Sequence, residues 1–300
     1  MIRIGTRKST LALWQAQRVK DGLEKLGEKC ILVPIESQGD QNLESPIYAM
    51  GIQGVFTRAL DTALLNNTID IAIHSLKDVP TLLPQGIGIA AVLERGAVED
   101  VVVYHPNFKD WEHHQIIGTG SLRRKAQWLR KYPHHQVDNL RGNVQTRLET
   151  LKKSNWGGAL FAHAGLDRLG LLKDHFEVLH WMLPAPAQGA ICICSLNSNK
   201  KLNELVKSIH CPKTDLCVTV EREFLRTLEG GCTAPIGAWA QVKGDTLFFK
   251  GGLFSLEGKI AIEVEDQIAV ENANGFGIQV ANSILNKGGK ELMKKIKKGL

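Results

Sequence analysis

The sequence has few cysteines and few aromatic residues, and it contains no long hydrophobic run. Its six cysteines form no C-x-x-C pair and show no zinc-type spacing. This argues against a disulfide scaffold or a zinc module, and most cysteines are expected to be small buried residues in a reducing compartment. No apolar run could span a bilayer, and "MIRIGTRKST" lacks the features of a secretory signal. These absences predict a cytoplasmic protein.

The composition is typical of a soluble globular protein, with 43% hydrophobic and 23% charged residues. At 300 residues the chain is longer than a single hydrophobic core usually supports, so two or three domains are expected. Part of the formal net charge of +6 lies in the tail "KELMKKIKKGL", where lysines complement a helix dipole. The arginines are more informative than this tail, because they recur at one kind of place.

Arginines follow predicted strands at the point where a helix begins. In "IRIGTRKST" a short strand breaks at Gly5 and Thr6, and a helix follows that is capped near Ser9. Arg7 therefore lies in the turn between strand and helix.

Two later segments repeat this arrangement. In "IIGTGSLRRKAQW", Ser121 is the predicted cap, and Arg123 and Arg124 lie in the first turn of the next helix. In "VDNLRGNVQTRL", Arg141 ends a predicted strand and Arg147 lies in the first helical turn.

A cation in the first turn of a helix opposes the helix dipole, at a cost of up to ~1 kcal/mol. Its repetition indicates a bound anion, because helix N-termini offer free backbone N–H groups and arginine adds bidentate binding of carboxylate or phosphate. The carboxyl ends of parallel strands share one edge of a sheet, so these sites can converge on one cleft. The predicted ligand is a small molecule with several negative charges.

A faint internal repeat suggests how the chain is divided. "IGTRKSTLALW" and "IGTGSLRRKAQW" share an Ile-Gly-Thr turn, a nearby serine and a tryptophan, although chance similarity also explains so short a match. If the repeat is real, it implies two related α/β lobes. The first covers 1–95 with a returning segment at about 191–208, and the second covers 96–187.

The remaining residues, 213–300, predict a small α+β domain. A helix capped by Thr214 ends at Gly230 and Gly231, and strands then alternate around a Gly244-Asp245 turn before two helices. "LEGGCTAPIG" places Cys232 on the loop that enters these strands.

Another apolar run, "IDIAIHSLKDVP", ends abruptly in polar residues that include His74, Ser75, Lys77 and Asp78. From the residues alone, Asp78 is equally well explained as a functional carboxylate or as a turn residue before Pro80.

Seven motifs in order resemble those of the porphobilinogen deaminase (hydroxymethylbilane synthase) family: "GTRKS", "HSLKDVP", "GTGSLRR", "LRGNVQTRL", "AGLDRLG", "PAPAQGA" and "LEGGCTAPIG". The resemblance implies two periplasmic-binding-protein-like α/β lobes around a cleft and a small C-terminal domain. It implies an enzyme of tetrapyrrole (haem) biosynthesis that joins four porphobilinogen molecules head to tail, releasing ammonia at each step, on a dipyrromethane that a thioether attaches to Cys232.

The resemblance also implies roles for single residues. Asp78 is the expected catalytic group, which stabilises positive charge on the pyrrole ring and relays a proton. The residues expected to hold the cofactor are Cys232, Lys77, Ser75, Ser121, Arg123, Arg124 and Gly189. The residues expected to bind substrate carboxylates are Arg7, Ser9, Arg141, Arg147 and Arg168. No metal, nucleic acid or membrane is expected, and the chain is expected to be a monomer.

The sequence departs from the family pattern in two places. In the 43–58 segment, which should fold over the cleft, Ala49 and Gln53 stand where lysines are common. In "LERGAVED", Gly96 and Ala97 stand where acidic residues are common, which affects the expected hinge between the lobes.

Other classes of protein explain parts of the pattern. A two-lobed binding protein for a small polycarboxylate would share the cleft and the arginines, but it would not need a loop thiol or a third domain. A nucleic-acid binder would explain the net charge, but its basic residues should form a surface stripe. A cysteine hydrolase would use the thiol, but no local signature supports it.

Overall fold

The computed structural model describes residues 1–36, 57–172, 175–228 and 234–299. By their contacts the described residues form two compact units. Unit 1 contains residues 1–36, 57–96 and 189–216, and unit 2 contains the described residues of 97–188 and 217–299. The expected second lobe and C-terminal domain therefore lie together in unit 2, and the division into three domains stays a prediction.

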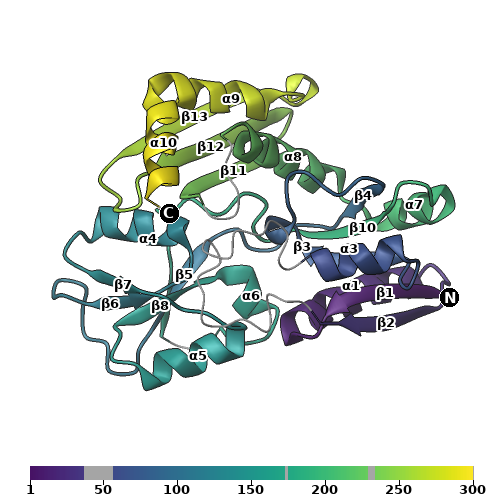
Figure 1. Cartoon of the computed structure of the whole chain (residues 1–300), viewed down its shortest axis with the longest axis horizontal. Helices are drawn as coiled ribbons and strands as arrows, with labels where there is room; N and C mark the ends of the chain where they lie inside the picture. The colour runs from purple at the N-terminus through teal and green to yellow at the C-terminus, as the bar shows by residue number, and fades with distance from the viewer. Residues whose placement is uncertain (37–56, 173–174, 229–233, 300) are drawn as a thin grey trace. The chain divides into compact units, whose positions relative to one another are not determined.

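Unit 1 is built on a five-stranded sheet with the order β2-β1-β3-β10-β4 (Figure 1). β1 is parallel to both β2 and β3, whereas β10 is antiparallel to β3 and β4. The strands are β1 (Ile2–Arg7), β2 (Cys30–Ile35), β3 (Ile71–Ser75), β4 (Ile87–Val92) and β10 (Ile191–Leu196). The helices are α1 (Thr10–Glu24), α3 (Arg58–Leu65), α7 (Lys200–Val206) and the 3-10 turns η2 (Leu76–Asp78) and η3 (Lys207–Ile209).

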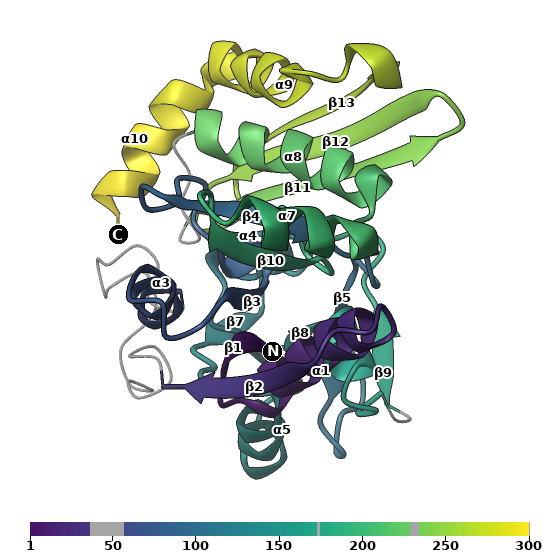
Figure 2. The same ribbon diagram turned by 90° about the vertical axis from the view of Figure 1, so that its right-hand side faces the viewer.

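The core of unit 1 follows from the apolar spacing of α1 and the strands. Ala16, Val19 and Leu23 recur at helical spacing and pack with Ile4 of β1 and Ile193 of β10, all completely or almost completely buried. Figure 2 shows α1 lying along β1 and β2. The returning strand β10 thus lies inside the sheet, where Cys192 and Cys194 are buried as predicted.

Unit 2 contains a second five-stranded sheet, with the order β7-β6-β8-β5-β9. β6 is parallel to β7 and β8, and β5 is antiparallel to β8 and β9. The strands are β5 (Asp100–Tyr104), β6 (Ile116–Gly118), β7 (Gln136–Asp138), β8 (Gly158–Ala162) and β9 (Phe176–Val178). The helices are α4 (Leu122–Lys131), α5 (Val144–Lys153) and α6 (His163–Asp167).

The two sheets have the same arrangement when β6, β7, β8, β5 and β9 are matched with β1, β2, β3, β10 and β4. The strand directions match as well, which supports the repeat suggested by the two Ile-Gly-Thr turns. The α/β class of the prediction is confirmed. Both sheets are mixed rather than purely parallel, because each receives one antiparallel strand from a distant part of the chain.

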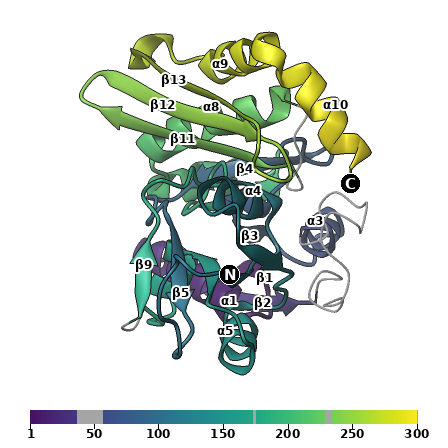
Figure 3. The ribbon, with the colours of Figure 1, turned by 90° about the vertical axis from the view of Figure 1, so that its left-hand side faces the viewer.

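The C-terminal part of unit 2 is a three-stranded antiparallel sheet, β11-β12-β13, with helices packed against it (Figure 3). Gly244 has a φ of 56° and makes the predicted hairpin turn. The elements are α8 (Pro212–Thr227), which begins in unit 1, β11 (Ile236–Lys243), β12 (Thr246–Phe254), β13 (Ala261–Ala269), η4 (Val270–Asn272), α9 (Phe276–Ile284), the π-helical turn η5 (Leu285–Gly289) and α10 (Lys290–Lys298).

Two predictions about where elements begin and end were wrong. β1 continues through Gly5 and Thr6 to Arg7, because the Thr6 hydroxyl is buried and donates to the Ala12 carbonyl of α1 (3.0 Å). α8 begins at Pro212, which suits the first helical position, so Thr214 lies inside the helix rather than at its cap.

Candidate active site

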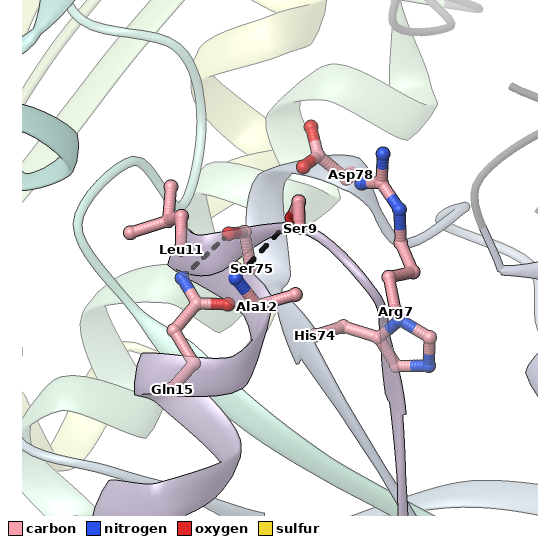
Figure 4. A pocket seen from close by; sticks show the side chains of 8 residues that line it. All are labelled: Arg7, Ser9, Leu11, Ala12, Gln15, His74, Ser75 and Asp78. Carbon is pink, nitrogen blue, oxygen red and sulfur yellow. Dashed lines mark hydrogen bonds between the residues drawn. The ribbon is translucent and has the colours of Figure 1, made fainter. Parts of the chain in front are cut away.

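The pocket of unit 1 lies where β1 and β3 end and α1 begins (Figure 4). Because β1 and β3 are parallel neighbours, their carboxyl ends meet at one edge of the sheet. Asp78 and the guanidinium of Arg7 extend to the same end of the pocket in Figure 4. The lining residues are Arg7, Ser9, Leu11, Ala12, Gln15, His74, Ser75 and Asp78.

Two hydroxyl groups of the pocket are held by local hydrogen bonds. Ser9 is the N-cap of α1, as predicted, and its Oγ accepts from the Ala12 backbone N–H (3.3 Å). Ser75 ends β3, and its Oγ accepts from Nε2 of Gln15 (2.8 Å), a side chain that is 2% exposed. Gln15 was not predicted from the sequence as a site residue. The feature of the sequence that could have indicated Gln15 is its position as a polar residue on the apolar stripe of α1, next to Ala16.

His74 also lines the pocket, although no role was predicted for it from the sequence. Burial, together with the nearby charge of Arg7, lowers the pKa of His74 to about 4. The imidazole is therefore neutral at neutral pH. Within the described residues its Nε2 has no hydrogen-bond partner.

Asp78 reaches the pocket because the chain turns directly after β3. Residues Leu76–Asp78 form the 3-10 turn η2, in which Leu76 is completely buried and anchors the turn. Asp78 is the carboxylate among the lining residues. Lys77 is half-buried in the same turn but does not line the pocket.

In unit 2, Ser121 is the N-cap of α4, as predicted, and its Oγ accepts from the Arg124 backbone N–H (3.4 Å). Arg123 and Arg124 are buried and both form ion pairs with Asp100, at 2.6 and 2.8 Å. A bound anion was inferred from the position of these arginines in the first turn of a helix. In the structure, the anion that both arginines contact is the side chain of Asp100. That they also hold the cofactor stays a prediction.

Asp100 and Gln188 were missed by the sequence analysis. Burial raises the pKa of the Asp100 carboxyl, but the charges of Arg123 and Arg124 outweigh it and hold that pKa well below its usual range. Gln188 donates to Asp100 Oδ1 (3.0 Å) and to the Val98 carbonyl (2.8 Å). The signal for Asp100 is an acidic residue directly before the apolar run "VVVY".

The other predicted arginines of unit 2 lie in a loop, inside a helix and directly after a helix. Arg141 was predicted to end a strand, but β7 ends at Asp138 and Arg141 lies in the loop before α5. Arg147 lies in the first turn of α5, and its Nε donates to the Gly142 carbonyl (2.7 Å). Arg168 follows α6, and burial lowers the pKa of both Arg141 and Arg168.

Gly189 has a φ of 84°, a backbone conformation that favours glycine, and its carbonyl accepts from the Gly96 N–H (3.1 Å). Cys232 lies outside the described residues, as do Ala49 and Gln53. The described part of the chain contains no group of three or more metal-ligating side chains placed to hold an ion. None of its helices is both long and apolar enough to cross a membrane.

Fold and site together define a two-lobed α/β protein with a guanidinium, hydroxyls and a carboxylate gathered at the ends of parallel strands. Residues 2–204 match the family model described as "Porphobilinogen deaminase, dipyromethane cofactor binding domain", and residues 215–286 match that of the porphobilinogen deaminase C-terminal domain. The chain therefore belongs to the porphobilinogen deaminase family, and the family resemblance seen in the sequence is confirmed.

Curated relatives extend over almost the whole chain. Porphobilinogen deaminase of Carboxydothermus hydrogenoformans is 39% identical, covering 98% of this chain and 97% of the relative. That of Desulfosudis oleivorans is 38% identical, covering 99% and 98%. Among solved structures, a periplasmic binding protein of Salmonella typhimurium with high arginine specificity covers 73% of this chain and 92% of its own at 12% identity, with a TM-score of 0.41. That similarity is too low to support an argument.

These matches settle the class of protein. The chain is an enzyme, and the predicted dipyrromethane cofactor agrees with the domain that residues 2–204 match. The alternative of a two-lobed binding protein is not favoured.

Proposed function

We propose that this chain has hydroxymethylbilane synthase activity. It joins four porphobilinogen molecules head to tail, releases one ammonia at each step and frees the linear hydroxymethylbilane by hydrolysis, as a step of tetrapyrrole biosynthesis. The observation that supports this most strongly is the pocket of unit 1, where Asp78 and Arg7 lie together at the strand ends in a member of this family.

The side chains of the pocket fit a dipyrromethane and its substrate. Each porphobilinogen unit has a pyrrole N–H and two carboxylate arms, so its site must contain an acceptor for the N–H and donors for the carboxylates. Asp78 is the acceptor, and Arg7, Ser9 and Ser75 are donors. The N-terminus of α1 adds the partial positive charge of its dipole.

Asp78 would act on the charge that develops in the reaction. When bound, the dipyrromethane supplies a free pyrrole α-carbon as the nucleophile for chain growth. The porphobilinogen that reacts with it loses ammonia from its aminomethyl group, and positive charge spreads to the pyrrole nitrogen. A carboxylate that accepts the pyrrole N–H would stabilise this charge, and it can relay the proton that the leaving amine needs.

The predicted site residues other than Asp78 are assigned either to the cofactor or to the substrate. The residues assigned to the cofactor are Ser75, Lys77, Ser121, Arg123, Arg124 and Gly189. A growing chain adds two carboxylates with every ring, so several further residues are needed for the substrate. The residues assigned to the substrate carboxylates are Arg7, Ser9, Arg141, Arg147 and Arg168. We further propose that the thiol of Cys232 is the point of covalent attachment, and we keep a cytoplasmic monomer as a prediction.

Intact mass spectrometry of the purified protein tests this proposal together with an assay of porphobilinogen consumption. The expected mass exceeds that of the polypeptide by two porphobilinogen units less two ammonia. A protein with the mass of the bare polypeptide that also leaves porphobilinogen unconsumed would contradict the proposed activity.

A further inference from the structure

Asp100 occupies a rigid position in unit 2. It is the first residue of β5, which is hydrogen-bonded on both sides, and it pairs with Ala162 of β8. Its backbone carbonyl accepts from the Leu179 N–H (2.8 Å), and its side chain is 0% exposed. The backbone that carries the carboxylate is therefore held in place on both sides, and solvent does not compete for the hydrogen bonds of the carboxylate.

The two oxygens of this carboxylate receive donors from three side chains. Oδ2 accepts from Nη1 of Arg123 (2.6 Å). Oδ1 accepts from Nε of Arg124 (2.9 Å), and Nη2 of the same guanidinium is 2.8 Å away. Gln188 Nε2 adds a further donor to Oδ1 (3.0 Å). This nearly fills the acceptor capacity of one carboxylate, so both arginines are tied to it.

Backbone carbonyls complete the orientation of the two guanidinium groups. Nη1 of Arg123 also donates to the Leu183 carbonyl (2.6 Å), and Nη1 of Arg124 donates to the Leu160 carbonyl (3.0 Å). Each guanidinium thus has partners in two directions, and its plane is set by Asp100 together with one carbonyl.

The cluster carries an uncompensated charge. Two guanidinium groups, with side chains 4% and 6% exposed, share one carboxylate, which leaves a net charge of +1 in a buried place. Among the side chains that the structure describes, no second carboxylate forms an ion pair with either arginine, and Nε of Arg123 has no hydrogen-bond partner. Burying a charge without a counter-ion is costly, so the cluster is suited to receive an anion.

We propose that Asp100 is a positioning residue, which fixes the orientation of the Arg123 and Arg124 guanidinium groups. In this orientation their excess positive charge binds a carboxylate arm of the dipyrromethane. This inference rests on the proposed function. Asp100 acts through the arginines and touches no reacting atom. The Arg3–Asp70 pair of unit 1 is the natural comparison, because there one partly exposed guanidinium meets one carboxylate and no charge is left over.

The test compares Asp100→Asn with Asp70→Asn. Asparagine keeps the shape of Asp100 but removes its charge, so the arginines lose their common anchor. We expect the share of folded Asp100→Asn molecules that carry the dipyrromethane mass to fall severalfold, and KM for porphobilinogen to rise by about 10- to 100-fold in the loaded fraction, because small misplacements of binding groups are costly. The Asp70→Asn protein should match the wild type in both measurements. Folded Asp100→Asn with full cofactor content and an unchanged KM would overturn the proposal.

A second variant covers the case in which Asp100→Asn does not fold. Asp100→Glu keeps the charge that the buried arginines need and moves the carboxylate by one methylene group. We expect it to fold, with lower cofactor content and a higher KM than the wild type, whereas wild-type values for both would overturn a positioning role. The proposed function fails separately, because the wild-type protein itself would then lack the added mass.

Discussion

Asp78 is the carboxylate that lines the pocket of unit 1, and its place follows from the 3-10 turn after β3. We expect Asp78→Ala to lower kcat by about 10²- to 10³-fold, because a preorganised group that stabilises developing charge is removed. Asp245→Ala, on the exposed hairpin turn of unit 2, is the control and should keep the wild-type rate. Steady-state assays of porphobilinogen consumption measure both, and a kcat within threefold of wild type for Asp78→Ala would move the catalytic role to another group.

The buried imidazole of His74 makes stability depend on pH. Its pKa is about 4 in the folded protein and 6.5 ordinarily, so below pH 6.5 the unfolded chain binds a proton that the folded protein does not. The free energy of unfolding should therefore fall as the pH drops from about 6.5 to 4, and His74 contributes about 3 kcal/mol of this loss at the low end.

Urea unfolding of wild type and His74→Leu at several pH values from 7 to 4 measures this contribution. Leucine cannot titrate, so the loss of stability between these pH values should be smaller in the variant. Parallel curves for the two proteins would show that His74 is protonated as readily in the folded protein as in the unfolded chain.

At the scale of single elements, the matched strands β1 and β6 each contain a glycine where a neighbouring side chain packs closely. A Cβ at Gly118 would meet the indole ring of Trp156, which is rigid and held by a hydrogen bond from its Nε1 to Asp138 (2.9 Å). A Cβ at Gly5 would meet the flexible ends of Ile69 and Leu60.

Gly118→Ala should therefore lower the free energy of unfolding by about 1–3 kcal/mol. Gly5→Ala should cost less, because methyl ends can move aside more easily than a fixed ring. Thermal and urea denaturation of the two variants give the comparison, and a larger cost for Gly5→Ala would contradict it.

At the scale of the whole molecule, the proposed activity depends on a thiol that lies outside the described residues. Cys232→Ser should yield folded protein with the mass of the bare polypeptide, because serine cannot form the thioether. Cys30→Ser, which alters a half-buried thiol of unit 1, is the matched control and should keep the added mass. Intact mass spectrometry distinguishes them, and an unchanged addition on Cys232→Ser would place the attachment elsewhere.

The sequence by itself determined the features that depend on residues only a few positions apart, such as helix caps and tight turns. Ser9 and Ser121 were predicted as helix caps because a cap and its N–H partner are three residues apart. The Gly244 turn follows from the same kind of local rule, and the ordered motifs were sufficient to indicate the family.

Only the tertiary structure decided what the buried charges meet. Asp100 lies 23 residues before Arg123 and 88 before Gln188, so no local spacing indicates that both side chains donate to the Asp100 carboxylate. The antiparallel β10 likewise enters the first sheet from more than 100 residues beyond β3. Such pairings depend on which surfaces are removed from water together, and this is a property of the assembled sheets rather than of any one segment.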